Sequence, residues 1–147
     1  MKRFQMIAII SMLLMGMAAW AQPKESAANA PAFPGALSAA RYVYVSSYDG
    51  SQFNPDTLLD DQKAVGAVQD ALRKWGKLMV VTRRSEADIV ILVLSRPSED
   101  VLAVYDGRQP LSGNYLWRVT APGGLQAGET PLVTQFEKAF EGVQKYN

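Results

Sequence analysis

Cysteine and histidine are both absent from this chain of 147 residues. Without cysteine there are no disulfides and no lipid attachment at a processed N-terminal cysteine, so packing alone must hold the fold together. The two absences also exclude zinc sites built from thiolate or imidazole, Ser-His-Asp triads and Cys-His dyads. The sequence therefore predicts a protein that is not an enzyme and that needs neither a cofactor nor a metal.

Long hydrophobic runs are scarce, and the longest one lies near the N-terminus. Lys2 and Arg3 precede about fourteen mostly apolar residues that end at Ala19, which is short of the roughly twenty that a spanning helix needs. Ala19 and Ala21 are small residues at the two positions that a signal peptidase reads. Residues 1–21 are thus expected to be a signal peptide that is cleaved after Ala21. The mature protein would be secreted or periplasmic and would meet a membrane only transiently, through this leader.

An excess of either charge is also missing. The formal net charge of the chain is +1, and removal of Lys2 and Arg3 with the leader would change it to −1. A nearly neutral protein has no general electrostatic attraction to nucleic acids or anionic membranes. We therefore expect no nucleic-acid partner.

Residues 22–38 are rich in proline, alanine, serine and asparagine. Such a composition is typical of an unstructured tether, and we predict a disordered segment over this range. The remaining residues, 39–147, have the length of one domain with a single core.

Two periodicities define the elements of this domain. Residues 41–48 alternate between aromatic or polar and aliphatic side chains, as a strand does. The apolar residues Leu58, Val65 and Leu72 lie on one helical stripe that Gly76 ends. We expect an α/β two-layer sandwich, with one mixed five-stranded sheet, two helices on one face and the order β-α-β-β-β-β-α. The expected strands are 41–48, 78–82, 89–94, 101–105 and 115–120, and the expected helices are 58–75 and 131–143.

Several short motifs resemble those of small secreted bacterial α/β domains. One is a helix that ends in Trp75-Gly76 before a short strand, with Ala87-Asp88 leading into a fully apolar strand. This order is similar to the N-terminal domain of the Tol-Pal translocation protein and to the periplasmic domain of the curli secretion lipoprotein. The hairpin of Tyr105-Asp106-Gly107-Arg108 and Leu116-Trp117-Arg118 resembles that of uncharacterised secreted families, and Pro131 to Phe136 resembles the start of their last helix. The resemblance implies the same fold, and no catalytic residue carries over from it.

Acidic residues offer a weak case for metal or acid chemistry. Asp56, Asp60 and Asp61 do not follow the spacing of a calcium-binding loop. Carboxylates are also common at the positive end of a helix, and this is the interpretation that we favour. Glu99 and Asp100 are interpreted in the same way, as an acidic turn. Arg83-Arg84 has the charge to bind an anion, but basic residues between strands are common, so an ordinary turn is favoured there as well.

Tyrosines suggest one specific binding hypothesis. If Val43 and Val45 face the helices, then Tyr42 and Tyr44 lie on the opposite face of the sheet, which two helices on one side leave uncovered. Such an aromatic face is suited to an extended peptide, a glycan or a second copy of the protein. The alternative is an ordinary half-buried sheet face.

The sequence as a whole predicts a non-catalytic secreted or periplasmic domain that serves in binding or in envelope assembly. Its partner is unknown, and an envelope protein or a second copy of the chain are the options. One alternative function is a carboxylate-only hydrolase of the glycosidase type, which needs two acids that converge in a cleft. Another is a self-associating structural domain that uses an exposed strand edge.

Overall fold

The computed structural model describes residues 32–126 and 128–145. Over this part of the chain the strands and α-helices follow the predicted order β-α-β-β-β-β-α, with short 3-10 helices before the first strand and before the third. The elements are η2 (Gly35–Leu37), β1 (Tyr42–Ser47), α1 (Leu59–Trp75), β2 (Met79–Val80), η3 (Arg84–Glu86), β3 (Ile89–Ser95), β4 (Asp100–Asp106), β5 (Trp117–Ala121) and α2 (Pro131–Gln144).

The five strands form one mixed sheet in the order β2-β1-β3-β4-β5. β1 is parallel to both of its neighbours, β2 and β3, whereas β3, β4 and β5 pair antiparallel. Parallel neighbours cannot be joined by a tight turn, so the chain crosses over between β1 and β2 through α1. β4 and β5 form a hairpin at the other edge. The expected mixed sheet is confirmed.

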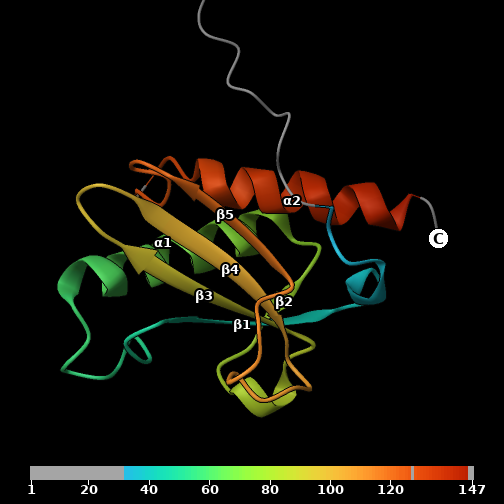
Figure 1. Cartoon of the computed structure of the whole chain (residues 1–147), viewed down its shortest axis with the longest axis horizontal. Helices are drawn as coiled ribbons and strands as arrows, with labels where there is room; N and C mark the ends of the chain where they lie inside the picture. Colours follow the sequence, from blue (N-terminus) through green and yellow to red (C-terminus); the bar gives the residue numbers. More distant parts are fainter. Residues whose placement is uncertain (1–31, 127, 146–147) are drawn as a thin grey trace, which may run out of the picture.

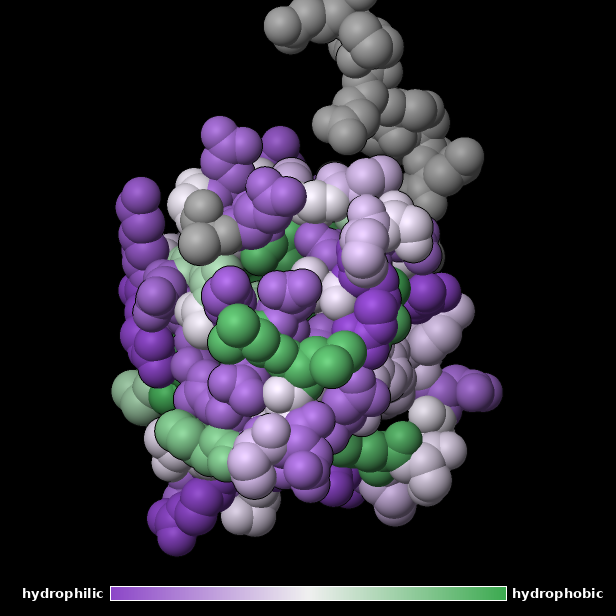
Figure 2. Space-filling view, turned by 90° about the vertical axis from the view of Figure 1, so that its left-hand side faces the viewer, coloured by the Kyte–Doolittle hydropathy of each residue, from purple (hydrophilic) through white to green (hydrophobic). Residues whose placement is uncertain are grey.

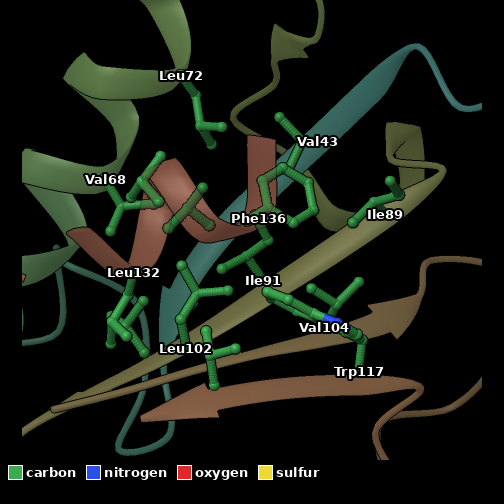
Figure 3. Close-up of a cluster of buried hydrophobic side chains, with 14 of the residues drawn as sticks. Val43, Val68, Leu72, Ile89, Ile91, Leu102, Val104, Trp117, Leu132 and Phe136 are labelled. Atoms are coloured by element: carbon green, nitrogen blue, oxygen red, sulfur yellow. The ribbon is translucent and has the colours of Figure 1, made fainter. Parts of the chain in front are cut away.

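Both α-helices cover the same side of this sheet (Figure 1). The strand residues that face them alternate along the chain, as a period of two requires. In Figure 3 their side chains point toward α1 and α2, and the rings of Trp117 and Phe136 meet edge to face at 6.1 Å between centroids. This confirms the predicted two-layer sandwich. The fully buried residues of this core include Val43, Ile89, Ile91, Leu102, Val104 and Trp117 from the sheet and Val65, Val68, Leu72, Leu132, Phe136 and Phe140 from the helices.

The helix α1 ends where the sequence predicts. Gly76 follows its last residue in the left-handed region, at φ 77°, and its N–H donates to the carbonyl of Leu72 at 2.9 Å. A residue without Cβ adopts this conformation at little cost, so the chain can leave the helix there and enter β2. The strand β2 is shorter than expected, because after Val81 has donated to the Val43 carbonyl the chain turns away toward η3.

The folded part begins before residue 39. Phe33 and Leu37 are only 7% and 6% exposed, although both lie in the range 22–38 for which the composition predicts a tether. The ring of Phe33 lies edge to face with Trp117, Phe136 and Phe140, at 5.7–5.8 Å between centroids. Burying one aromatic side chain contributes about 1.5–3 kcal/mol, which favours ordering this segment. The structure thus differs from the predicted tether at residues 33–38, whereas residues 22–31 lie outside the described residues.

We expect three glycine substitutions to change stability in opposite directions. Gly66→Ala and Gly142→Ala lie inside helices with nothing within 4 Å of the added Cβ, so each should raise the free energy of unfolding by about 0.5–1 kcal/mol. At Gly107, an added Cβ would lie 2.0 Å from the backbone oxygen of Ala87, so Gly107→Ala should lower the same quantity by about 1–3 kcal/mol. Urea denaturation measures all three. A Gly107→Ala protein as stable as the wild type would contradict this close backbone contact.

Candidate functional site

The described tyrosines gather on the side of the sheet that faces away from the helices. Tyr42 and Tyr44 alternate with core residues of β1, and Tyr48 continues the same parity just beyond the strand. Tyr105 comes from β4, and Tyr115 lies just before β5. We call these five residues the tyrosine face. The two residues that the sequence selected, Tyr42 and Tyr44, are thus brought together with three more from later in the chain.

A second, smaller core lies beneath this face. Val90 and Ala103 are fully buried there, and Tyr44 and Leu111 pack against this cluster. Loops before and after the strands therefore cover part of a surface that two helices alone would leave bare. Tyr105 is 8% exposed and belongs to the packing. The exposed members of the face are Tyr42 at 41%, Tyr48 at 43% and Tyr115 at 49%.

Two contacts organise the centre of the tyrosine face. The hydroxyls of Tyr48 and Tyr105 lie 3.1 Å apart and share a hydrogen bond. Burial and this hydrogen bond raise the pKa of the Tyr48 hydroxyl well above its usual range, so it stays neutral near pH 7. The guanidinium carbon of Arg118 lies 5.9 Å from the centroid of the Tyr115 ring, within the range of a cation–π contact. The face therefore offers neutral hydroxyls and one cation that is held against an aromatic ring.

A cavity adjoins Tyr105, inside the loop that joins β4 to β5. Its volume is about 260 Å³. Amide and hydroxyl side chains supply most of its polar atoms, and Tyr105 and Leu116 supply its apolar wall. The lining residues are Tyr105, Asp106, Gln109, Pro110, Ser112, Gly113, Asn114 and Leu116.

Asp88 fixes the start of β1, where the tyrosine face begins. One carboxylate oxygen accepts the backbone N–H groups of Arg41 and Tyr42, at 2.9 and 3.1 Å. The other lies 3.6 Å from the guanidinium of Arg108. These donors favour the charged form, so they lower the pKa of Asp88 below its usual range, with the hydrogen bond from Arg41 as the largest cause. Asp88, from the Ala-Asp pair before β3, thereby sets the position of Tyr42.

At the opposite end of β3 lies a buried carboxylate, Asp61. It is 0% exposed and accepts the N–H of Ser95 at 2.7 Å and the guanidinium of Arg96 at 3.0 Å to each oxygen. Arg96 also donates to Asp49 at 2.8 Å. Asp61 lies in the first turn of α1, as predicted for a helix-end acid, but its carboxylate binds the end of β3, which the sequence did not predict. Local sequence contains no signal for this pair, whose members are 35 residues apart.

The prediction that Asp100 lies in an acidic turn is wrong. It opens β4, is 3% exposed and accepts the Ser95 hydroxyl at 2.8 Å and the N–H of Leu125 at 2.9 Å. Together with Asp60 it contributes to the wall of a cavity of about 350 Å³, which Lys63 and Arg96 also line. This is the place where the described residues bring two carboxylates to one cavity. Both oxygens of Asp100 already accept hydrogen bonds, as in a structural carboxylate.

Exposed hydrophobic side chains mark the start of α1. Phe53, Leu58 and Leu59 are 81%, 53% and 63% exposed. Figure 2 views the molecule from this side and shows hydrophobic side chains separated by hydrophilic ones. Ala19 and Ala21, the residues expected at the signal-peptidase site, lie outside the described residues.

Residues 32–126 and 128–145 contain neither an acidic metal cluster nor a membrane-spanning helix. No group of three or more acidic side chains is placed to hold a metal ion there. No helix in the same part of the chain has the length and apolar character to cross a bilayer.

No protein-family model matches this chain, and no curated protein matches it. Among solved structures, the PelC dodecamer from Paraburkholderia phytofirmans is similar over 79% of this chain and 94% of the PelC chain. The sequence identity is 17% and the TM-score is 0.37. We draw nothing about fold or function from a similarity at this TM-score.

Removal of the Asp61 carboxylate should be strongly destabilising. Asp61→Ala leaves Arg96 without its buried partner and the Ser95 N–H without an acceptor, so we expect a loss of about 3 kcal/mol in the free energy of unfolding. The matched control is Asp60→Ala, in the same helical turn but exposed, which should cost less than about 1 kcal/mol. Guanidinium denaturation compares the two. Equal losses would contradict a special role for the buried carboxylate.

Acid should weaken the fold in part through Asp88. Because its pKa is lower when folded than when unfolded, its ionisation stabilises the protein above the unfolded pKa of about 3.9, and this contribution is lost as the pH falls through the folded pKa. Asp88→Asn should therefore be clearly less stable than the wild type at pH 7. The gap between the two should narrow at about pH 2. Urea denaturation at both values tests this, and a gap independent of pH would contradict it.

Proposed function

We propose that this protein is a non-catalytic binding domain of the bacterial envelope or secretome, and that a glycan chain binds across the tyrosine face. The observation that carries the proposal is that all tyrosines within residues 32–126 and 128–145 lie on or beside one sheet face, away from both helices. The expected leader and the resemblance to secreted α/β domains, both predictions from sequence, agree with this location.

Tyrosine suits a glycan for a physical reason. Its ring presents a flat apolar surface, and its hydroxyl forms hydrogen bonds at the edge. A sugar ring has the complementary pattern, with C–H groups on its faces and hydroxyls around its rim. Arg118 and the amide-rich cavity beside Tyr105 add the polar groups that orient a ligand. The exposed rings of Tyr42, Tyr48 and Tyr115 supply the area on which the sugars would lie.

A peptide fits the same face less well. Peptides that join a sheet do so by adding a strand to a free edge, where main-chain groups are open. The tyrosine face is centred on β1, β3 and β4, which all have a neighbouring strand on both sides. A ligand on this face therefore meets side chains and not a strand edge.

Tyrosine-to-serine substitutions test the proposal. Binding of the mature protein to an array of bacterial envelope oligosaccharides identifies a ligand, and calorimetry measures its affinity. We expect the Tyr42→Ser/Tyr44→Ser double variant and Tyr115→Ser each to bind at least about fivefold more weakly, because each removes an aromatic contact worth about 1 kcal/mol or more. The control is Leu59→Ser, which removes an exposed apolar side chain on α1, outside the face, and should bind as the wild type does.

Several results would overturn this function. If no oligosaccharide binds, or if the tyrosine variants bind as tightly as the wild type, the face is not a glycan site. If the wild type dimerises and Tyr115→Ser abolishes the dimer without any glycan, the face is an interface between copies. If the bound glycan is hydrolysed and Asp100→Asn stops hydrolysis, the carboxylate-only hydrolase is correct, with Asp60 and Asp100 as its pair.

A further inference from the structure

A third cavity lies where η3 meets the turn after β4. Its volume is about 450 Å³, and it is open to solvent. Two arginines contribute to its wall, and no acidic side chain does. The lining residues are Arg84, Ser85, Gly107, Arg108, Gln109 and Pro110.

Arg84 carries a positive charge that no described acid neutralises. Its guanidinium donates to the backbone carbonyl of Gln109 at 2.7 Å, which is a neutral acceptor. Its Nε is buried and has no hydrogen-bond partner. A guanidinium has five N–H donors in a rigid fork, and a buried donor without an acceptor is unfavourable. The buried Nε is out of reach of a ligand, but an oxyanion in the cavity would supply the negative charge that the guanidinium lacks.

The neighbouring Arg83 shows the contrast. Its guanidinium forms an ion pair with Glu86 within η3. The pair of adjacent arginines that the sequence offers as an ordinary basic turn is therefore divided by the fold. Arg83 is compensated and exposed to solvent, whereas Arg84 is held against the β4–β5 loop without an acidic partner.

Arg108 adds the second cation. Its side chain is 79% exposed, and its nearest acid is Asp88, 3.6 Å away. That carboxylate already accepts two backbone N–H groups through its other oxygen. Arg108 is therefore free to turn toward a ligand in the cavity, because its one ionic contact is long and exposed.

The backbone around the cavity is fixed in advance. The N–H of Gly107 donates to the carbonyl of Asp88 at 2.8 Å, and the absence of a side chain lets the turn lie directly against Ala87. Arg84 is held to the loop on the far side through Gln109. Binding of a ligand therefore needs no ordering of this backbone, and the exposed side chain of Arg108 is what must still be ordered.

We propose that Arg84 and Arg108 form a binding site for an oxyanion, a carboxylate or phosphate group. Guanidinium forks match both groups through paired N–H donors. This cavity and the one beside Tyr105 share Gln109 and Pro110, so a ligand on the tyrosine face can extend into it. The site itself does not depend on the proposed function. Only the source of the anion does: an anionic glycan if that function holds, and a free anion otherwise.

Titration of the mature wild-type protein with inorganic phosphate tests the site directly. At constant ionic strength we expect saturable NMR shifts at the amides of Ser85, Gly107 and Gln109. Arg84→Gln should weaken the affinity at least about tenfold, because it removes a charged fork, and Arg108→Gln should weaken it several-fold. Phosphate should also raise the Tm of the wild type but not that of Arg84→Gln, since only a folded protein with the site gains from the ligand.

Two controls keep this result specific. Arg83→Gln removes a neighbouring charge that Glu86 compensates, so it should bind phosphate as the wild type does. Arg84→Lys keeps the charge but loses the fork, and it should bind more weakly than the wild type. Absence of saturable shifts in the wild type would overturn the proposal. So would equal loss in Arg83→Gln and Arg84→Gln, which would indicate attraction to charge in general.

A second titration identifies the source of the anion. The probes are an oligogalacturonate, whose sugars carry carboxylates, and a neutral oligosaccharide of the same length. If the oligogalacturonate binds more tightly than the neutral chain, and both Arg84→Gln and Tyr115→Ser weaken it, the anion is part of a glycan. If phosphate binds while neither oligosaccharide nor any member of the array does, the glycan function is wrong. The oxyanion site is then confirmed as a site for a free anion.

Discussion

The pairing of Asp61 with Arg96 sets the geometry on which much of this structure depends. It ties the start of α1 to the end of β3, and through Asp49 it also holds the loop that leaves β1. α1 is the crossover between parallel strands, so its position decides how the hydrophobic stripe meets the sheet. A buried carboxylate without its guanidinium would be strongly unfavourable, and the contact therefore permits few other arrangements of these three segments. In a protein without disulfides, such a contact restricts the relative positions of distant segments, as a covalent link would.

The two faces of the sheet are covered in different ways. On one side, aliphatic and aromatic residues of five strands and two helices form a dry core that buries Trp117 and Phe136 completely. On the other, tyrosines and a loop cover Val90 and Ala103, and their hydroxyls stay at the surface or pair with one another. Tyrosine can do both because one end of its side chain is apolar and the other is polar. The same residues therefore complete the fold and present a surface to a ligand.

Charge is distributed locally and not across the whole molecule. The net charge is close to zero, so long-range attraction to polyanions is weak. Within the described residues no acid forms an ion pair with Arg84, whereas Arg83 beside it and Arg96 at the other end of β3 are paired. The proposed oxyanion site and the tyrosine face meet at the β4–β5 loop, where Gln109 borders a cavity of each. A chain of sugars with acidic groups would match both surfaces at once.

Local periodicity in the sequence determined the helices, the alternation along β1 and the stop at Gly76, because each depends on residues within a few positions of one another. It also placed Tyr42 and Tyr44 together on one face. Tertiary structure alone decided the burial of Phe33, the partner of Asp61 and the role of Asp100. It also decided that the guanidinium of Arg84 meets a neutral carbonyl. Asp61 and Arg96 are 35 residues apart, and Arg84 meets the carbonyl of Gln109 across 25. Such contacts exist only after the ends of distant elements have been brought to the same place, and no local pattern records which ends will meet.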